Sequence, residues 1–213
     1  MTGLFITIEG IEGAGKTTSI QYMESLLKIA DVSFILSREP GGTEIAEAIR
    51  KLLLSHYQEK MSEDAELLLM FASRAQHLET LIRPALKAGT MVLCDRFTDA
   101  SYAYQGGGRG IDVGRIKMLE DWVQGALQPD LTILLDLPVE VGFLRASNRS
   151  HADRIESEAM HFFEKVRQAY LDRAKQFSNR YRVIDVNVPV EEVQQQLKQL
   201  FETEVLPQVS IHE

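Results

Sequence analysis

Residues 4–17 read LFITIEGIEGAGKT, and this stretch decides the fold that the rest of the chain must complete. Its first six residues are mostly apolar and rich in β-branched side chains, which favours a short buried strand. Residues 10–17 then match the spacing GxxxxGK(S/T). The apolar residues Ile20, Met23 and Leu27 follow at helical spacing. The stretch therefore predicts a strand, a glycine-rich turn and a helix in direct succession.

The glycine-rich turn has the composition of a phosphate cradle. Its three glycines permit backbone angles and close approaches that a Cβ would obstruct, so successive N–H groups can surround phosphate oxygens. Lys16 can place its charge at the β- and γ-phosphates, and the Thr17 hydroxyl can bind Mg²⁺. A glycine-rich turn without a ligand is the alternative interpretation. The motif favours binding of a nucleoside triphosphate by Gly10, Ile11, Glu12, Gly13, Ala14, Gly15, Lys16, Thr17 and Thr18.

Four further runs of strand type recur at residues 33–37, 91–95, 131–136 and 182–185, separated by amphipathic helical patterns. Strands separated by helices cannot pair as hairpins, so we expect five parallel strands with helices on both faces. The predicted fold class is α/β. The 213 residues, of which 45% are hydrophobic, are enough for one domain over the whole chain. Loops at the carboxyl ends of the strands should carry the function.

The bulk composition excludes several classes of partner. A net charge of -8 disfavours a nucleic-acid polymer or an anionic membrane, because both attract positively charged surfaces. The sole cysteine, Cys94, allows no disulfide within the chain and no cysteine-based metal site. No apolar stretch approaches the ~20 residues of a membrane span, and the first residues lack the features of a secretion signal. We expect a cytoplasmic protein.

The cradle leaves the reaction open, because GTPases, motor ATPases and small-molecule kinases share it. The sequence contains neither an NKxD motif for guanine nor a DxxG switch, which disfavours a GTPase. Asp95 ends the third predicted strand, where a carboxylate can organise the hydration shell of Mg²⁺, and Arg96 follows it toward phosphate. Arg38 lies at the equivalent exit of the second strand. A surface salt bridge is the alternative interpretation of either arginine.

Three further segments, together with the cradle, resemble the bacterial thymidylate kinase family: REPGGT at 38–43, DRF at 95–97 and AYQGGGRG at 103–110. RASNRSHADRIE at 145–156 is similar to the arginine-bearing lid of that family. The resemblance covers nearly the whole chain. It implies a P-loop kinase fold with a mobile lid, ATP as phosphoryl donor with Mg²⁺, and dTMP as the acceptor that becomes dTDP. It also implies a homodimer formed through helices, in which residues 67–70 could take part.

The resemblance further implies the residues of the acceptor site. Arg38 and Arg96 would hold the monophosphate of dTMP, and Pro40 would shape the nucleoside pocket. Residues 67–79 are typical of a helix whose apolar positions mostly serve the core, and that is the alternative interpretation of Phe71. Under the resemblance, Phe71 matches the residue that stacks on thymine, and Arg74 matches the donor to the base O4. Cytosine carries an amine at that ring position, so the arginine would face a second hydrogen-bond donor. An arginine there would therefore disfavour cytosine.

The segment around 101–105 is implied to hold the sugar and the base. Tyr104 corresponds to a tyrosine that packs beneath the sugar and leaves no space for a 2′-hydroxyl, which implies a preference for deoxyribose. Ser101 matches a small polar residue near N3 of the base, with Gln105 in the same pocket. Glu12 matches an acidic residue that meets the sugar 3′-hydroxyl or the metal shell. A turn with a core tyrosine is the alternative interpretation.

The expected chemistry requires cations rather than a general base. A phosphate monoester is largely dianionic near neutral pH, since its second pKa is ~6. The catalytic problem is therefore to bring two anions together. The resemblance places lid arginines over the transferring phosphoryl group. The catalytic candidates are Lys16, Arg96, Arg149 and Arg154, and the candidate Mg²⁺ ligands are Thr17 and Asp95.

Two other functions stay open on the sequence. A kinase for another nucleoside monophosphate would share the cradle and the lid. An ATP-dependent switch, or an ATPase that binds a partner, would lack a phosphoryl acceptor. ADP release measured with different acceptors, and without one, separates these functions.

Overall fold

The computed structural model describes residues 3–146 and 153–209. Over these residues the chain forms a five-stranded sheet in the order β2-β3-β1-β4-β5, and each pair of neighbours is parallel. The predicted α/β class with five parallel strands is confirmed. Strand β2 begins one residue later than predicted and β5 one residue earlier. The strands are β1 (Phe5–Glu9), β2 (Phe34–Arg38), β3 (Met91–Asp95), β4 (Leu131–Asp136) and β5 (Tyr181–Asp185).

Burial of the strands follows their place in the sheet. All five residues of β1 are buried, because this strand has a neighbour on each side and helices on both faces. In the register, Ile8 lies opposite Asp95 of β3 and Ile133 of β4. The edge strands β2 and β5 keep partly exposed positions. The continuous apolar runs in the sequence are therefore the central strands.

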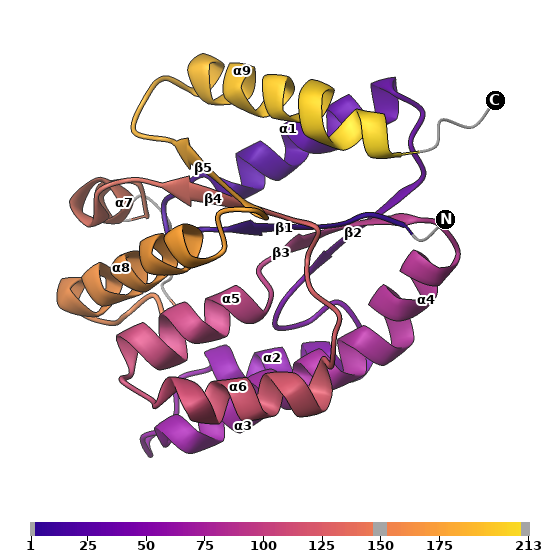
Figure 1. Ribbon diagram of the computed structural model, residues 1–213. Coiled ribbons are helices and arrows are strands. Elements are labelled where there is room, and N and C mark those ends of the chain that lie inside the picture. Colours follow the sequence, from indigo (N-terminus) through magenta and orange to yellow (C-terminus); the bar gives the residue numbers. More distant parts are fainter. Residues whose placement is uncertain (1–2, 147–152, 210–213) are drawn as a thin grey trace.

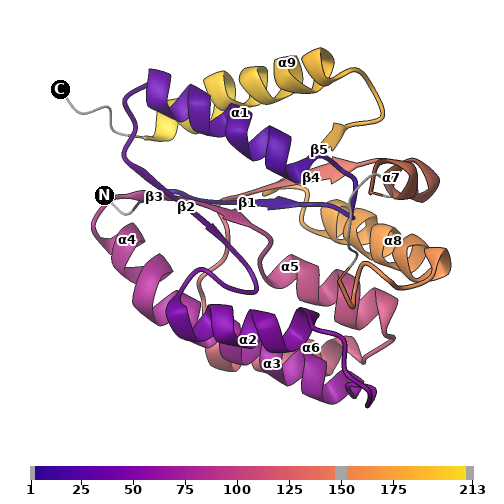
Figure 2. The same cartoon turned by 180° about the vertical axis from the view of Figure 1, so that it is seen from behind.

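Helices cover both faces of the sheet (Figures 1 and 2). Helices α1 (Lys16–Ile29) and α9 (Val190–Leu200) pack together on one face. Within the described part of the chain, no helix is both long and apolar enough to cross a membrane. The opposite side carries α2 (Glu44–Leu54), α3 (Glu63–His77), α4 (Arg83–Lys87), α5 (Thr98–Ser101), α6 (Val113–Val123) and α8 (Met160–Gln176), while α7 (Val139–Ala146) follows β4.

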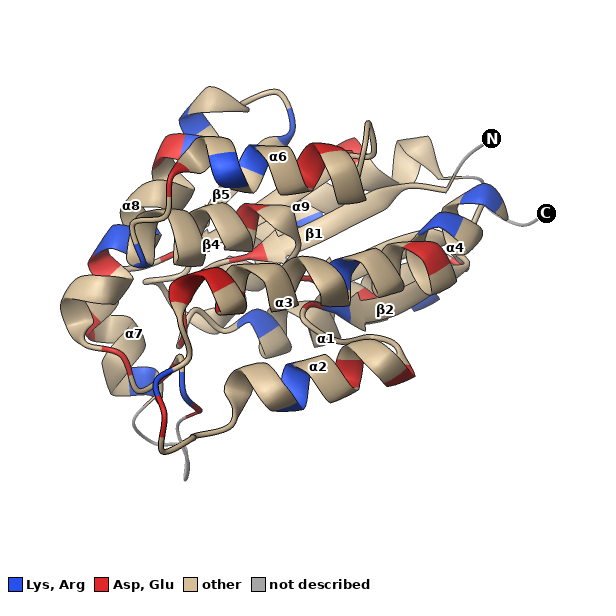
Figure 3. Ribbon diagram, turned by 90° about the horizontal axis from the view of Figure 1, so that it is seen from below, with Lys and Arg blue, Asp and Glu red and all other residues tan. Residues whose placement is uncertain are grey.

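Helix α3 shows why its boundary falls where it does. The Ser62 hydroxyl accepts a hydrogen bond from the Ala65 amide at 3.3 Å and so caps the first turn. Glu63, Asp64 and Glu66 fill that turn with negative charge, visible at the start of α3 in Figure 3. Carboxylates at the N-terminal end of a helix interact favourably with the positive end of the helix dipole. The capped helix presents Arg74 and His77 near its other end.

The glycine-rich segment Tyr102–Gly108 is helical, with a wider turn than an α-helix, and it packs on α8. A Cβ at Gly107 would lie 2.7 Å from the Ala169 Cβ and 2.9 Å from the Lys165 carbonyl oxygen. Glycine is therefore needed for the close approach of the two segments. This packing sets the position of Tyr104, which precedes the glycines.

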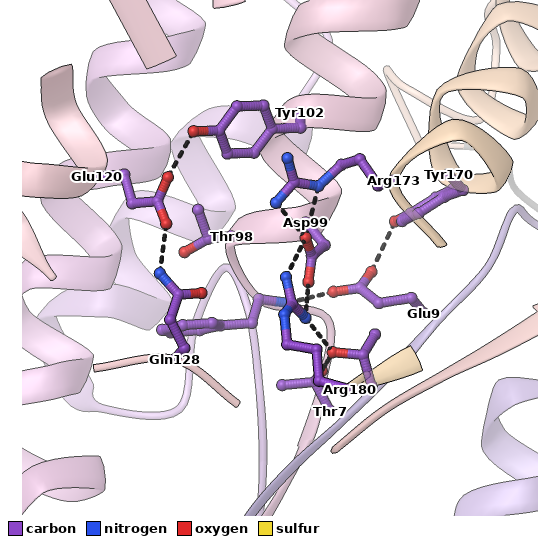
Figure 4. Close-up of polar contacts among 12 residues, drawn as sticks. Thr7, Glu9, Thr98, Asp99, Tyr102, Glu120, Gln128, Tyr170, Arg173 and Arg180 are labelled. Atoms are coloured by element: carbon purple, nitrogen blue, oxygen red, sulfur yellow. Dashed lines mark hydrogen bonds and ion pairs between the residues drawn. The ribbon is translucent and has the colours of Figure 1, made fainter. Parts of the chain in front are cut away.

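A buried ionic network ties α8 and the start of β5 to α5 (Figure 4). Asp99 accepts hydrogen bonds from Arg173 at 2.6 Å and from the two terminal nitrogens of Arg180 at 2.7 and 2.9 Å. Arg180 also donates to the Thr132 hydroxyl, which is 3.0 Å from the Thr7 hydroxyl. Removing one partner of such a network leaves an uncompensated buried charge and costs about 3–5 kcal/mol. The network fixes α8 relative to the sheet.

Candidate active site

Residues 10–15 form the predicted turn between β1 and α1, and the side chain of Lys16, the first residue of α1, folds back onto this turn. The Lys16 ammonium donates to the carbonyl oxygens of Gly10 at 2.9 Å and Ile11 at 3.2 Å. Burial lowers the pKa of Lys16 to about 8, and the nearby Arg96 cation acts in the same direction. An anionic phosphate beside the ammonium would restore its charge, which is the electrostatic behaviour of a phosphate-binding lysine.

The turn lies directly against α7. Gly13 has a φ of 77°, and a side chain there would collide with the carbonyl oxygen of Gly142. A Cβ at Gly142 would in turn lie 2.6 Å from the carbonyl oxygen of Glu12. The two backbones therefore need glycine on both sides of the contact.

A cavity of about 250 Å³ opens beside the turn, where β1, β2 and β3 end. The predicted residues that line it are Glu12, Gly13, Gly15, Lys16, Thr17, Pro40, Arg74, Asp95, Arg96, Ser101, Tyr104 and Gln105. Among the described residues, the predicted ones that do not line it are Gly10, Ile11, Ala14, Thr18, Arg38, Phe71 and Arg154. The lining residues that the sequence analysis missed include Glu39, Arg50, Met70, Phe97, Asp153 and Glu156.

Arg96 is the centre of a polar cluster in the cavity. Its φ of 69° is unusual for a residue with a side chain. The guanidinium donates to Glu12 at 2.8 Å and to the Tyr170 hydroxyl at 3.3 Å, and it lies 4.7 Å from the centre of the Tyr104 ring. The Tyr104 hydroxyl donates to both carboxylate oxygens of Glu12, at 2.9 and 2.8 Å. The structure thus brings three predicted residues into direct contact.

Glu9 supports this cluster from inside the protein, and the sequence analysis did not identify it. Its carboxylate accepts from the Tyr170 hydroxyl at 2.6 Å (Figure 4) and from the amide of Phe97 at 2.8 Å. Burial raises the pKa of Glu9 to about 8, with a smaller rise from the negative charge of Asp99. Glu9 thereby holds the peptide that follows Arg96 and the tyrosine that contacts it.

Arg74 also lines the cavity, and its guanidinium is almost fully buried. It donates to Glu39 at 2.7 Å and to the Phe97 carbonyl oxygen at 3.2 Å. Its remaining terminal nitrogen, Nη1, has no hydrogen-bond partner in the part of the chain that the structure describes. A buried donor without a protein partner can be satisfied by a bound water or by an acceptor atom of a ligand.

Phe71 does not reach the cavity. It lies in a separate core cluster with Leu67, Tyr102 and Ile116, between α3 and α6. Met70, one position earlier on the helix, lines the cavity instead. The geometry therefore offers Met70, and not the predicted Phe71, as the apolar side chain beside a bound base.

Arg50, which the sequence analysis did not identify, lines the cavity, whereas the predicted Arg38 does not. Arg38 is 53% exposed and both oxygens of Glu47 accept from it at 3.0 Å. Arg50, on α2, lines the cavity and donates to the Pro40 carbonyl oxygen at 2.8 Å. Burial, followed by the adjacent Arg38 cation, lowers the pKa of Arg50. The carboxylate of Glu47, which accepts from Arg38, partly offsets this effect on Arg50.

The candidate Mg²⁺ ligands, Thr17 and Asp95, both line the cavity. The Oδ1 atom of Asp95 is buried without a hydrogen-bond partner among residues 3–146 and 153–209. Over the same residues, no three His, Cys, Asp or Glu side chains gather closely enough to hold a metal ion alone. The donor set fits Mg²⁺, which keeps several waters and takes few protein ligands.

The predicted lid is described only in part. Arg149 lies outside the described residues. Arg154 lies 2.7 Å from a carboxylate oxygen of the buried Glu66 and donates to the Leu53 carbonyl oxygen at 2.8 Å, so it is held away from the cavity wall. Glu66 also accepts from the amide nitrogen of Gln105 at 2.9 Å. The described part of the lid is thus anchored through Glu66.

The parallel sheet, the phosphate cradle at the end of β1 and the arginine-lined cavity beside it define a P-loop phosphotransferase. Comparison with known proteins narrows this class. The sequence model of the family described as thymidylate kinase matches residues 8–197 of this chain. The chain belongs to the thymidylate kinase family, which confirms the resemblance in its motifs.

Individual relatives agree with this assignment. The thymidylate kinase of Ectopseudomonas mendocina is 59% identical over 194 residues, which are 91% of this chain and 92% of the relative. That of Pseudomonas entomophila is 58% identical over 200 residues, 94% of this chain and 95% of the relative. The crystal structure of thymidylate kinase from Ehrlichia chaffeensis has a TM-score of 0.75 and 33% identity, covering 95% of this chain and 100% of that one.

Proposed function

We propose that this protein transfers the γ-phosphoryl group of ATP to dTMP, giving dTDP and ADP for dTTP synthesis. The observation that carries the proposal is one cavity of about 250 Å³ lined both by the phosphate cradle and by Arg74 and Tyr104. A triphosphate on the cradle and a deoxynucleoside monophosphate in the cavity would meet with their phosphates adjacent. Family membership supplies the identity of the acceptor.

Catalysis rests on positioning and on positive charge. The acceptor phosphate is largely dianionic at neutral pH, because its second pKa is ~6, and it attacks without a general base. Lys16 neutralises the transferring group, and Arg96 orients the acceptor while Glu12 holds the arginine in place. Magnesium held by Thr17 and Asp95 would neutralise further charge on the phosphates of ATP. The protein thereby offsets the repulsion between two anions.

The acceptor phosphate binds between Arg96 and Arg50. Both side chains line the cavity, and both are partly buried, which strengthens their pairing with an anion. Arg38 contributes a more distant positive charge from its exposed pair with Glu47. Pro40, whose carbonyl oxygen accepts from Arg50, shapes the wall beside the phosphate.

The thymine ring lies against Met70, and its O4 accepts from the free nitrogen of Arg74. Ser101 and Gln105 line the same side, with Ser101 near N3 of the base. Tyr104 packs beneath the deoxyribose, where its hydroxyl bonds to Glu12 keep the ring from moving aside. A ribose 2′-hydroxyl would meet this fixed ring.

Residues 1–213 act as one kinase domain, with a lid at about 145–156. Arg149 supplies the lid's catalytic charge, and Arg154 joins it if closure releases the pair with Glu66. Closing over the phosphates would exclude water and limit ATP hydrolysis.

The active form is a cytoplasmic homodimer that buries the outer face of α3 and α6. Leu68 on α3 is 57% exposed, and Met118 and Trp122 on α6 are 71% and 82% exposed. Of the four residues 67–70, Leu67 and Met70 are buried within the protomer, Leu69 is half-buried and only Leu68 is exposed to a partner. A buried free thiol at Cys94 is compatible with the reducing cytoplasm.

The test is a panel of acceptors with MgATP. ADP release is measured with dTMP, dUMP, dCMP, dGMP and AMP, and without an acceptor. We expect dTMP to give the highest kcat/KM and the reaction without acceptor to be slow. Equal ADP release with and without dTMP would identify an ATPase instead, and a better acceptor than dTMP would identify another nucleoside monophosphate kinase.

A further inference from the structure

Arg74 is the last member of a buried chain of polar side chains. Ser37, at the end of β2, lies 2.7 Å from Nε2 of His77, and Nδ1 of His77 lies 3.0 Å from Oε1 of Glu39. Oε2 of Glu39 accepts from Nε of Arg74 at 2.7 Å. His77, Glu39 and Arg74 are 0%, 4% and 2% exposed. No role proposed above uses Ser37, Glu39 or His77.

The chain fixes the orientation of the Arg74 guanidinium. Nε points to Glu39, and Nη2 points to the Phe97 carbonyl oxygen. The rings of Phe71 and Phe97 lie 4.6 and 5.3 Å from the guanidinium carbon. A planar group held by two hydrogen bonds cannot rotate without breaking one of them. Nη1 is therefore the nitrogen left for a ligand.

The same chain occupies the carboxylate of Glu39, which itself lines the cavity. With the His77 proton on Nδ1, His77 donates to one carboxylate oxygen, and Arg74 donates to the other. An unoccupied carboxylate would accept a hydrogen bond from an exocyclic amine, such as that of cytosine. Each oxygen keeps a further lone pair, but because both already accept a hydrogen bond, the carboxylate gains less from an added amine, while Nη1 of Arg74 favours a carbonyl oxygen.

The loop that carries Glu39 packs closely against Ser37 and His77. Gly42 has a φ of 86°, and a Cβ there would lie 2.5 Å from the Ser37 hydroxyl and 2.6 Å from Nε2 of His77. The Gly41 amide donates to the buried Ser73 hydroxyl at 3.2 Å, which anchors the loop to α3. The glycines of the REPGGT segment thus permit backbone contact with the chain.

We propose that Glu39 and His77 are positioning residues that set the base specificity of this enzyme, by holding one donor of Arg74 toward a carbonyl oxygen and by making the Glu39 carboxylate a weaker acceptor for an amine. This inference rests on the proposed dTMP kinase activity and deepens it. The preferred acceptor is a pyrimidine monophosphate with a 4-carbonyl group, and the disfavoured one carries a 4-amine.

The test compares kcat/KM for dTMP and dCMP in three variants. Glu39→Gln replaces the carboxylate by an amide, whose NH₂ group would face one of the two donors, Arg74 or His77. It also removes the negative charge that holds Arg74. Ser37→Ala removes only the far end of the chain. Ser73→Ala is the matched control, because it breaks a buried bond of the same loop that does not lead to Arg74. The KM for ATP and the thermal melting temperature are measured for each protein.

For Glu39→Gln we expect the dTMP-to-dCMP ratio of kcat/KM to fall about tenfold or more, mainly through a higher KM for dTMP. The KM for ATP should stay within about twofold of wild type, and Ser37→Ala should lower the ratio in the same direction by less. Ser73→Ala should leave the ratio unchanged. If Glu39→Gln does not fold, Ser37→Ala decides.

Each outcome bears on the inference. A folded Glu39→Gln enzyme with the wild-type ratio overturns it, as does a ratio that falls equally in Ser73→Ala. A wild-type enzyme that prefers dTMP while the variants keep that preference overturns the positioning role alone. A wild-type enzyme that does not phosphorylate dTMP overturns the proposed function and this inference together.

Discussion

Replacing Arg50 by alanine should weaken dTMP binding far more than replacing Arg38. Arg50 lines the cavity and is held by the Pro40 carbonyl oxygen, whereas Arg38 is 53% exposed and paired with Glu47. A hydrogen bond to a charged group contributes about 1.5–3 kcal/mol. At about 1.4 kcal/mol per factor of ten, Arg50→Ala should raise the KM for dTMP about 10- to 150-fold.

The expectation for Arg38 is much smaller. An exposed ion pair is worth about 0–1 kcal/mol, so Arg38→Ala should change the same KM by less than about fivefold. Lys51→Ala, which removes an exposed charge next to Arg50, controls for the loss of net positive charge. Initial rates of ADP formation at saturating MgATP, with dTMP varied, give the three values. A larger KM effect for Arg38→Ala than for Arg50→Ala would refute the assignment.

Three other substitutions test separate parts of the structure. Tyr104→Ala should increase the use of ribothymidine monophosphate relative to dTMP in the same assay; unchanged sugar discrimination would contradict the steric account. Asp99→Asn should lower the free energy of unfolding in urea by about 3–5 kcal/mol, because it leaves the buried Arg173 and Arg180 without their negatively charged partner. A loss below about 1 kcal/mol would show that the network is not stabilising. Burial raises the pKa of Glu9 from an ordinary 4.5 to about 8, so the folded protein keeps a proton that the unfolded chain releases in this window. Stability should therefore fall as pH rises from about 5 to 8, by up to about 1.4 kcal/mol per unit, and Glu9→Gln should flatten that slope in urea titrations; equal slopes would be contrary to this reading.

The sheet and the phosphate cradle could be predicted because their signals are local. Central strands that are buried on both faces must be continuously apolar, and the cradle requires fixed residue types at fixed spacing. Strand boundaries were one residue off in the central strand β1 as well as in the edge strands β2 and β5, because a run of apolar residues locates a strand without fixing its end residues. A turn was the alternative interpretation of the segment that contains the glycines at 106–108, whereas in the structure these glycines allow a helical segment to approach α8.

The cavity was harder to predict, because its wall depends on the rotation of helices. In the run LLLMF at 67–71 every position is apolar, so the sequence does not say which residue faces the cavity. One residue turns a helix by about 100°, and this decides between Met70 and Phe71. Arg50 was detectable in principle, since it lies four residues after the buried Ala46 on the same face of α2.

Charged residues that act through others were assigned no role from the sequence, although Glu39 lies within the REPGGT segment. Glu9 and Glu39 are adjacent to predicted site residues in the sequence, but their partners, Tyr170 and His77, come from distant helices. Arg154 illustrates the converse. Its place in the lid segment suggested the phosphates, and the contact with the buried Glu66 could be seen only in three dimensions.

The exposed position of Trp122 has a practical consequence. It is the only tryptophan of the chain, and at 82% exposure on α6 its indole lies in water in the isolated protomer. Indole emission shifts to shorter wavelength when water around the ring is replaced by apolar side chains. The intrinsic fluorescence of the unlabelled protein therefore reports whatever covers this helix, and a dilution series would follow dissociation of the proposed dimer as a red shift.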